Sequence, residues 1–433
     1  KNRSKYMKTN KFSPMLLALI TLILIPFGVF AEDGASAGQI AGDNAWMLTS
    51  TALVLLMTIP GVALFYGGLS RKQNVLSTLM HIFACTCVVT ITWCIVGYSI
   101  AYSEGTPYYG GLGNFLFEGM TINESPEVGT LPSGVDVTFQ ATFAIITTAL
   151  IAGSFAERIK FSSTLIFMAI WSIVVYAPIC HWVWGGGVLS EKGILDFAGG
   201  TVVHINCGVA GLVAALVVGR RSEGSYNYAP HNLIYTIVGA SLLWVGWFGF
   251  NAGSALGANE TAGNAMLVTQ IATAAAALSW MIVEWIIKGK PSVIGITGGA
   301  VAGLVAITPA SGFVYPMGAL IIGLVAGVAC WFFSSVVKTA MGYDDSFDVF
   351  GIHGVGGIVG ALLTGLLCVP ILGGEPGMEQ LGIQFYGILL VIGWCGFATF
   401  VILKVIDMTI GLRVSSKVEK EGLDVNLHGE VVS

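Results

Sequence analysis

Charged residues are scarce in this sequence, and the few that it has form no basic block. Asp, Glu, Lys and Arg make up 10% of the 433 residues, and the formal net charge of −5 is spread along the chain. A surface that binds nucleic acid needs clustered Lys and Arg side chains. The composition therefore excludes nucleic acid as a partner.

Metal and thiol motifs are missing as well. The eight cysteines form no CxxC pair, and no CxxC accompanies an HxxxH spacing. Cys85 and Cys87 are two residues apart, which places them on different faces of a helix. We interpret the cysteines as small buried apolar residues, and we predict no metal site and no cofactor. Because no nucleophile motif is present either, we predict that the chain is not an enzyme.

Apolar residues and glycine are abundant. The chain is 55% hydrophobic, contains 58 glycines and has a mean hydropathy of +0.82, which places it in a lipid bilayer. We predict an all-α membrane protein with eleven transmembrane helices. The expected spans are 45–69, 75–102, 137–156, 162–182, 198–219, 232–254, 263–287, 293–310, 317–337, 349–369 and 384–411.

Loop charges predict the direction of the spans. Lys and Arg fall on one set of alternating loops, as at Arg71, Arg158 and Arg220, whereas the other set offers only Lys192. Basic loops stay in the cytoplasm, so the mature N-terminus is expected outside and the tail 413–433 inside. The expected membrane domain is 44–412.

The N-terminal residues 1–31 resemble a targeting segment. A basic stretch with Lys8 and Lys11 precedes an apolar run over 15–30 and a site suited to signal peptidase at Val29-Phe30-Ala31. We interpret 1–31 as upstream residues and a cleaved signal peptide, with an uncleaved anchor as the alternative. Either places the short polar segment 32–43 on the outer side, which in a bacterium is the periplasm.

Two apolar runs each carry a histidine. His204 is followed by glycines at positions +4 and +7, and His353 has glycines at the same offsets. Residues at these offsets share one helical face, where a second helix or a narrow pore can approach closely. The two runs are the fifth and tenth expected spans, which predicts a 5+5 inverted repeat with a final bracing helix. A single buried histidine bonded to a neighbouring carbonyl is the alternative.

Aromatic residues gather where several spans are expected to reach the outer side. Phe143, Trp184 and Phe250 are such residues, and Ser254 adds a hydroxyl acceptor. An interfacial aromatic belt would explain some of them. Trp184, however, precedes three glycines that let backbone pack beneath an indole face. Aromatic faces beside a hydroxyl suit a small monovalent cation.

Such a cation cannot cross an apolar pore intact. Burying an ammonium-sized ion costs on the order of 20 kcal/mol in the idealised limit, whereas a cation–π contact returns about 0.5–2 kcal/mol. Deprotonating an amine of pKa ~10.4 at pH 7 costs only roughly 4–5 kcal/mol. A neutral amine could then cross beside His204 and His353, which would serve as a hydrogen-bonding track or as a proton relay.

Five motifs resemble those of the ammonium transporter (Amt/Mep/Rh) family, and of its bacterial Amt branch in particular. They are GVALFYGG at 61–68, HWVWGGG at 181–187, DFAGGTVVH at 196–204, GWFGFNAGS at 246–254 and DVFGIHG at 348–354. The resemblance implies a homotrimer in the bacterial inner membrane with one pore per subunit. The implied substrate is ammonium or ammonia, and methylammonium is a further candidate.

The resemblance also implies roles for individual residues. Phe143, Trp184 and Ser254 would recruit ammonium, with Asp196 holding that site, and Phe143 with Phe250 would form a gate. His204 and His353 would be the twin histidines of the pore, and the path would be lined by Trp247, Phe65 and Tyr66. Asp348 would be the inner counterpart of Asp196, or alternatively a helix N-cap.

Residues 421–430 resemble the cytoplasmic motif through which the family couples to the PII signalling protein. The sequence thus predicts a transporter that recruits ammonium, deprotonates it and conducts ammonia with a separately translocated proton. A passive ammonia channel and an ammonium sensor acting through PII are the alternatives. The acidic external loop, residues 103–136, would be solvated or would weakly gather cations.

Overall fold

The computed structural model describes residues 37–118, 120, 131–222 and 229–432. The predicted signal peptide, 1–31, lies outside these residues. The elements that precede residue 220 are α2 (Ala37–Leu56), η1 (Met57–Val62), α3 (Ala63–Leu69), η2 (Lys72–Asn74), α4 (Val75–Thr92), η3 (Trp93–Gly97), α5 (Tyr98–Tyr102), β1 (Gly105–Thr106), β2 (Tyr109–Gly110), η4 (Phe115–Phe117), α6 (Ser133–Ile151), α7 (Phe161–Trp171), η5 (Ser172–Tyr176), α8 (Ala177–Trp184), η6 (Gly200–Ile205) and α9 (Asn206–Val218).

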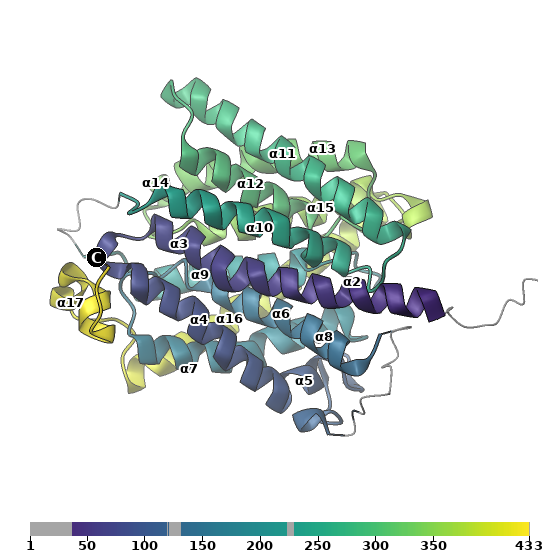
Figure 1. Cartoon of the computed structure of the whole chain (residues 1–433), viewed down its shortest axis with the longest axis horizontal. Coiled ribbons are helices and arrows are strands. Elements are labelled where there is room, and N and C mark those ends of the chain that lie inside the picture. Colours follow the sequence, from purple (N-terminus) through teal and green to yellow (C-terminus); the bar gives the residue numbers. More distant parts are fainter. Residues whose placement is uncertain (1–36, 119, 121–130, 223–228, 433) are drawn as a thin grey trace, which may run out of the picture.

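The elements that follow are α10 (Leu233–Gly253), α11 (Glu260–Lys288), α12 (Val293–Ile307), α13 (Pro316–Phe332), η7 (Phe333–Val337), α14 (Lys338–Met341), η8 (Phe350–Gly354), α15 (Val355–Leu367), η9 (Pro370–Leu372), α16 (Met378–Thr409), α17 (Ser416–Glu421) and η10 (Asp424–His428). Apart from the short β1–β2 hairpin, the described chain is a bundle of helices whose long axes run in roughly the same direction (Figure 1).

Ten helical segments in the described residues are long and apolar enough to cross a bilayer. The expected all-α membrane protein is confirmed by this finding. Ten of the eleven predicted spans correspond to these segments, and the remaining one, 293–310, corresponds to α12. With 15 residues, α12 extends about 22 Å, which is less than the ~30 Å of a hydrocarbon core. The count of eleven spans therefore stays a prediction.

Two helix beginnings differ from the sequence expectation. The first helix, α2, starts at Ala37, inside the segment 32–43 that was expected to be a polar stretch. There Asp43 is buried and accepts a hydrogen bond from the Ala258 N–H at 2.8 Å. Similarly, α6 starts at Ser133, so Asp136 belongs to a helix and is 4% exposed. Assigning Asp136 to a solvated loop was therefore wrong.

The two histidines lie in π-helical turns rather than in regular α-helix. His204 belongs to η6 and His353 belongs to η8, and each turn continues into an α-helix, α9 or α15. The packing is reciprocal, since η6 contacts α15 while η8 contacts α9. Each histidine-bearing turn thus contacts the helix that continues the other turn, which supports the predicted 5+5 inverted repeat.

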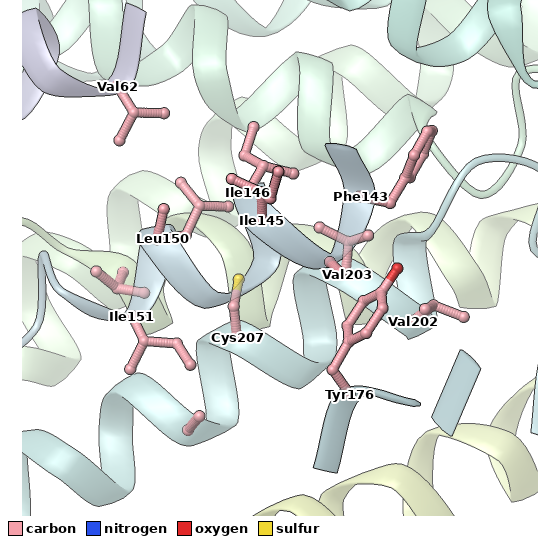
Figure 2. Packing of buried hydrophobic residues seen from close by; sticks show 14 of the residues in the cluster. Val62, Phe143, Ile145, Ile146, Leu150, Ile151, Tyr176, Val202, Val203 and Cys207 are labelled. Carbon is pink, nitrogen blue, oxygen red and sulfur yellow. The ribbon is translucent and has the colours of Figure 1, made fainter. Parts of the chain in front are cut away.

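Glycines allow these two segments to touch through their backbones. A Cβ atom added to Gly208 would lie 2.2 Å from the Gly354 nitrogen and 2.3 Å from its Cα. One of the glycine offsets noted in the sequence thus marks a real close approach. Side chains of α6, including Ile146 and Leu150, lie next to Val203 and Cys207 and cover another side of the His204 segment (Figure 2).

Basic and acidic side chains tie the loops together at the end of the bundle where α17 lies (Figure 1). Arg71 and Arg221 both bind the buried carboxylate of Glu157, at 2.9 and 3.2 Å. Arg221 also binds Asp344 at 2.7 Å. Burial opposes ionisation of Asp344, but the hydrogen bonds and charge of Arg221 hold the pKa of its carboxyl well below the usual range.

We expect Gly208→Ala to destabilise the protein strongly. The added methyl group meets backbone atoms, which cannot rotate away, and overpacking of this kind costs about 1–3 kcal/mol or more. The matched control is Gly393→Ala in α16, where a Cβ meets nothing within 4 Å. Thermal unfolding in detergent should show a lower midpoint for Gly208→Ala only. Equal midpoints for the two variants would contradict the close approach.

Candidate functional site

An aromatic cavity opens at the α5/α8 end of the bundle, opposite α17 (Figure 1). Its volume is about 990 Å³, and Phe143, Trp184 and Ser254 all line it. Phe143 comes from α6, Trp184 ends α8, and Ser254 follows α10, so three separate segments bring these side chains together. The grouping of these three residues, predicted from the sequence, is therefore present in the fold.

A second phenyl ring lies behind Phe143, which lines the aromatic cavity. Phe143 stacks on Phe250 with a centroid distance of 4.3 Å and an interplanar angle of 24°. The Trp184 indole meets the Phe143 ring edge-on at 5.7 Å. Both phenylalanines are at most 1% exposed. We call Phe143 and Phe250 the phenyl pair.

Asp196 holds the start of the His204 segment. Its Oδ1 accepts from the amides of Gly199 and Gly200 at 3.0 and 2.5 Å, and its Oδ2 accepts from those of Thr201 and Val202 at 2.9 and 3.0 Å. These amides belong to Gly199, which precedes η6, and to the first three residues of η6. Without Asp196, the amide donors at this helix start would be unsatisfied. Burial raises the pKa of this carboxyl to about 6, although the four amide donors act to lower it.

Asp196 reaches the aromatic cavity through its backbone rather than its carboxylate. The Trp184 Nε1–H donates to the Asp196 carbonyl oxygen at 2.8 Å, which fixes the indole at the cavity wall. A Cβ atom on Gly199 would lie 3.3 Å from the same indole. Asp196 therefore positions Trp184 and the histidine segment together.

Beyond the phenyl pair lie His204 and His353, which we call the histidine pair. Their Nδ1 atoms are 3.3 Å apart and their rings are nearly parallel, at 22°. A hydrogen bond between two Nδ1 atoms needs one protonated and one unprotonated nitrogen. If both rings are neutral, the two Nε2 atoms then differ, one accepting and one donating. Within the described residues, His204 Nε2 has no hydrogen-bond partner.

Trp247 completes this inner group. Its indole stacks on His204 at 5.2 Å and 19°, and its Nε1–H donates to the Thr308 hydroxyl at 2.9 Å. Phe65 and Tyr66 lie farther along, on α3, where the Tyr66 ring contacts Phe65 and Phe347. The Tyr66 hydroxyl donates to the Leu150 carbonyl at 3.1 Å. Phe250, Trp247 and the histidine pair thus form one continuous group of rings.

The acid that matches Asp196 in the second half is Asp345 rather than Asp348. Asp345 precedes His353 by eight residues, as Asp196 precedes His204, and its Oδ2 accepts from the Phe350 amide at 2.8 Å. Burial, together with the charge of Asp348, raises the pKa of Asp345 to about 6. Asp348 itself is partly exposed, has φ +59° and binds Lys338. Aligning the two halves on the histidines would have identified Asp345.

Other residues of the sequence analysis have structural contacts. His181 places its ring nitrogens 3.0 and 2.8 Å from the carbonyls of Ala101 and Thr106, and so joins α8 to the hairpin. His81 stacks on Phe161 at 5.7 Å. Cys207 was interpreted only as a small buried residue, yet its thiol and the histidine pair place ligand atoms within 4.8 Å of one another. The prediction of no metal site stays a prediction.

The C-terminal segment is docked rather than frayed. Glu419 is fully buried and binds Arg413 at 2.8 Å, and its Oε1 accepts from the Ser222 amide at 2.5 Å. The two oxygens of Asp424 accept from the amides of Leu76 and Ser77 at 3.0 and 2.8 Å, in the first turn of α4. The segment therefore connects loops that are far apart in the sequence.

The fold and this ring-lined interior define a polytopic membrane transporter. The sequence model described as the Ammonium Transporter Family matches residues 45–433. The chain is 51% identical over 421 residues to an ammonium transporter of Aquifex aeolicus, a match that covers 96% of this chain and 98% of that protein. It is 44% identical to an ammonium transporter of Bacillus subtilis, covering 90% and 98%. The chain belongs to the ammonium transporter family.

Solved structures agree with this assignment. The crystal structure of Candida albicans Mep2 superposes with a TM-score of 0.81 at 35% identity, covering 87% of each chain. A structure titled Sensor Amt Protein superposes with a TM-score of 0.84 at 29% identity, covering 90% of this chain and 99% of that one. The family is one of transporters and not of enzymes.

We expect Asp196→Asn to destabilise the site. An Asn side chain keeps one acceptor oxygen but turns an NH₂ group toward two of the four amide donors. Each buried donor left without an acceptor costs about 1–3 kcal/mol. The thermal midpoint in detergent should fall, whereas Glu379→Gln, which removes an exposed charge from α16, should leave it unchanged. A midpoint equal to that of the parent would mean that the carboxylate does not hold η6.

Glu419→Gln should release the C-terminal segment. The substitution removes the charge that binds Arg413 and replaces one acceptor oxygen by a donor. Limited proteolysis in detergent should cleave the variant after Arg413 faster than the parent. Glu421→Gln is the control, because the Glu421 side chain is 47% exposed and its ion pair is with the exposed Lys417. Identical cleavage rates in all three proteins would contradict the docking role.

Proposed function

We propose that this protein recruits ammonium in the aromatic cavity, deprotonates it and conducts ammonia past the histidine pair, with the proton translocated separately. The observation that carries the proposal is the order of groups along one path. The cavity with Phe143, Trp184 and Ser254 comes first, the stacked phenyl pair follows, and the hydrogen-bonded histidine pair lies behind it.

The aromatic cavity suits the cation. Phe143 and Trp184 offer ring faces and edges, and the Ser254 hydroxyl offers an acceptor, because its own proton is donated to the Phe250 carbonyl at 2.8 Å. Asp196 would support recruitment by fixing Trp184 and by adding its negative charge to the region. This environment stabilises a positive charge at the cavity.

The interior suits the neutral amine instead. The rings of Trp247 and Phe250 contact His204, and both histidines are at most 3% exposed. Ammonia can donate to an unprotonated Nε2 and accept from a protonated one, which is the complementary pair that an Nδ1–Nδ1 hydrogen bond produces. The proton left behind by NH₄⁺ would cross as a separate charge, with the histidine pair or a water chain as its route. Transport would then be electrogenic.

Two alternatives follow from particular features. A passive ammonia channel needs the same cavity and ring group but returns the proton to the side of recruitment. An ammonium sensor acting through a PII-type partner is favoured by the docked C-terminal segment, which joins the Ser222 loop to α4 through Glu419 and Asp424. Similarity to the structure titled Sensor Amt Protein is compatible with this second role.

The same proposal includes the assembly and the orientation of the protein. We propose a homotrimer in the bacterial inner membrane, with eleven spans, the N-terminus outside and the C-terminal segment in the cytoplasm. The gathering of Arg71, Arg158 and Arg221 at the α17 end supports this direction. Phe65 and Tyr66 would line the path at that end, and methylammonium would be a second substrate.

The proposal is tested by current from purified protein in liposomes on a solid-supported membrane after an ammonium jump. The parent should give an ammonium-specific current, Asp196→Ala should abolish it, and His204→Asp/His353→Glu should change its selectivity. Glu379→Gln, an exposed charge change on α16, is the control and should behave as the parent.

A second readout separates the alternatives. Ammonia influx raises the internal pH of a liposome, whether or not a net charge crosses. Absence of current together with such a pH change would establish a passive ammonia channel and would overturn the deprotonate-and-relay mechanism. Absence of both signals would leave sensing as the function to be pursued.

A further inference from the structure

A buried carboxylate lies in the wall of the aromatic cavity, away from the groups described above. Asp136 is in the first turn of α6, and Gln140 and Phe143 follow it at positions +4 and +7. Residues at these offsets share one helical face, so Asp136 lies two turns, about 10 Å, from Phe143 along α6. All three residues line the cavity, together with Trp184 and Ser254.

The carboxylate of Asp136 has an oxygen available to a ligand. Its Oδ2 accepts a long hydrogen bond of 3.4 Å from the Tyr98 hydroxyl. The Gln140 side chain also interacts with this carboxylate through its amide group, and its Oε1 accepts from the Tyr102 hydroxyl at 2.7 Å. Within the described residues, however, Oδ1 receives no hydrogen bond of normal geometry, although the side chain is buried. Such an orphan acceptor is costly unless a donor reaches it from the cavity.

The Asp136 carboxylate has no basic side chain opposite it in the described wall of the cavity. Among the described residues that line the cavity, none is Lys or Arg, and the aromatic rings of Tyr98 and Tyr102 flank the carboxylate side of the wall. A buried acid normally has a positive partner. An unpaired buried acid otherwise gives up its charge, whereas a small cation that enters through the cavity and carries N–H donors would satisfy both the charge and the orphan oxygen.

We propose that Asp136 forms an outer cation subsite, at which ammonium binds before it reaches Phe143, Trp184 and Ser254. The inference rests on the proposed function and deepens it, since it assigns a first binding step to a residue outside the recruitment site. Asp136 donates no proton in this step and changes no bond. It holds the cation by charge and by an N–H to Oδ1 hydrogen bond, and so raises the ammonium concentration at the phenyl pair.

The size of the effect follows from the separation. One carboxylate about 10 Å away favours a cation at the recruitment site by a factor of about 2 in a water-like dielectric and of about 15 at an effective dielectric of 20. Loss of the charge should therefore raise the half-saturating ammonium concentration by about two- to fifteenfold. The maximal current should change little, because the phenyl and histidine pairs are untouched.

The test compares Asp136→Asn with the parent by ammonium-dependent current in liposomes. Asp136→Asn is nearly isosteric and can still accept from Tyr98, so the expected result is a raised half-saturating concentration at unchanged maximal current. Glu104→Gln is the matched control, because Glu104 borders the same cavity but is exposed. Its smaller effect should vanish at high ionic strength, whereas the effect at the buried Asp136 should persist. Asp136→Glu should restore most of the affinity.

Two results would overturn the subsite. One is a half-saturating concentration for Asp136→Asn equal to that of the parent. The other is a half-saturating concentration that rises equally in Asp136→Asn and Glu104→Gln and returns to the parent value in both at high ionic strength, which would indicate a general surface field. If Asp136→Asn does not fold, Asp136→Glu and Tyr98→Phe provide the comparison, with the carboxylate retained in both. Both should then keep the parent's half-saturating concentration within about twofold, and a larger rise in both would count against the subsite.

Direct binding keeps the inference separate from transport. Calorimetric titration of the detergent-solubilised protein with ammonium chloride should show binding that weakens in Asp136→Asn and remains in His204→Ala. If the parent carries no ammonium current, the proposed transport fails, and this titration alone decides on the subsite. Equal binding by the parent and Asp136→Asn would refute it.

Discussion

The contact between the backbones of Gly208 and Gly354 is the constraint on which the interior of this protein depends. The two chain segments can approach to this distance because Gly208 has no Cβ atom, which would lie 2.2 Å from the Gly354 nitrogen. The approach brings His204 and His353 to a separation of 3.3 Å between their Nδ1 atoms. That separation makes their protonation states complementary, and the hydrogen-bonding character of the path follows from it.

A second constraint acts on the beginnings of the same two segments. A helix that starts inside a membrane protein exposes amide donors that no water can satisfy. Asp196 accepts four of these donors in one half, and Asp345 accepts the Phe350 amide in the other. Each histidine is thus held from both sides, by a carboxylate eight residues earlier and by a glycine contact just beyond it.

Much of the fold could be predicted because hydropathy acts over whole segments and because the same spacing of a histidine and two glycines recurs in two of them. The sequence predicted the spans, the pairing of the two histidines and the grouping of Phe143, Trp184 and Ser254. Local geometry was not available from the sequence. The π-helical turns at both histidines shift the helical offsets. Asp348 was chosen because it begins the second motif, DVFGIHG, whereas the eight-residue spacing that separates Asp196 from His204 identifies Asp345. Asp136 was misplaced because its helix starts before the apolar run does.

The docking of Asp424 against α4 has a consequence for biosynthesis. Leu76 and Ser77 belong to the second membrane span, yet the carboxylate that satisfies their amides is encoded almost 350 residues later. During synthesis, therefore, the early spans are inserted with this helix start still bonded to water or lipid headgroups. The α17 end of the bundle therefore reaches its final state only after α16 has been inserted and Asp424 has been synthesised.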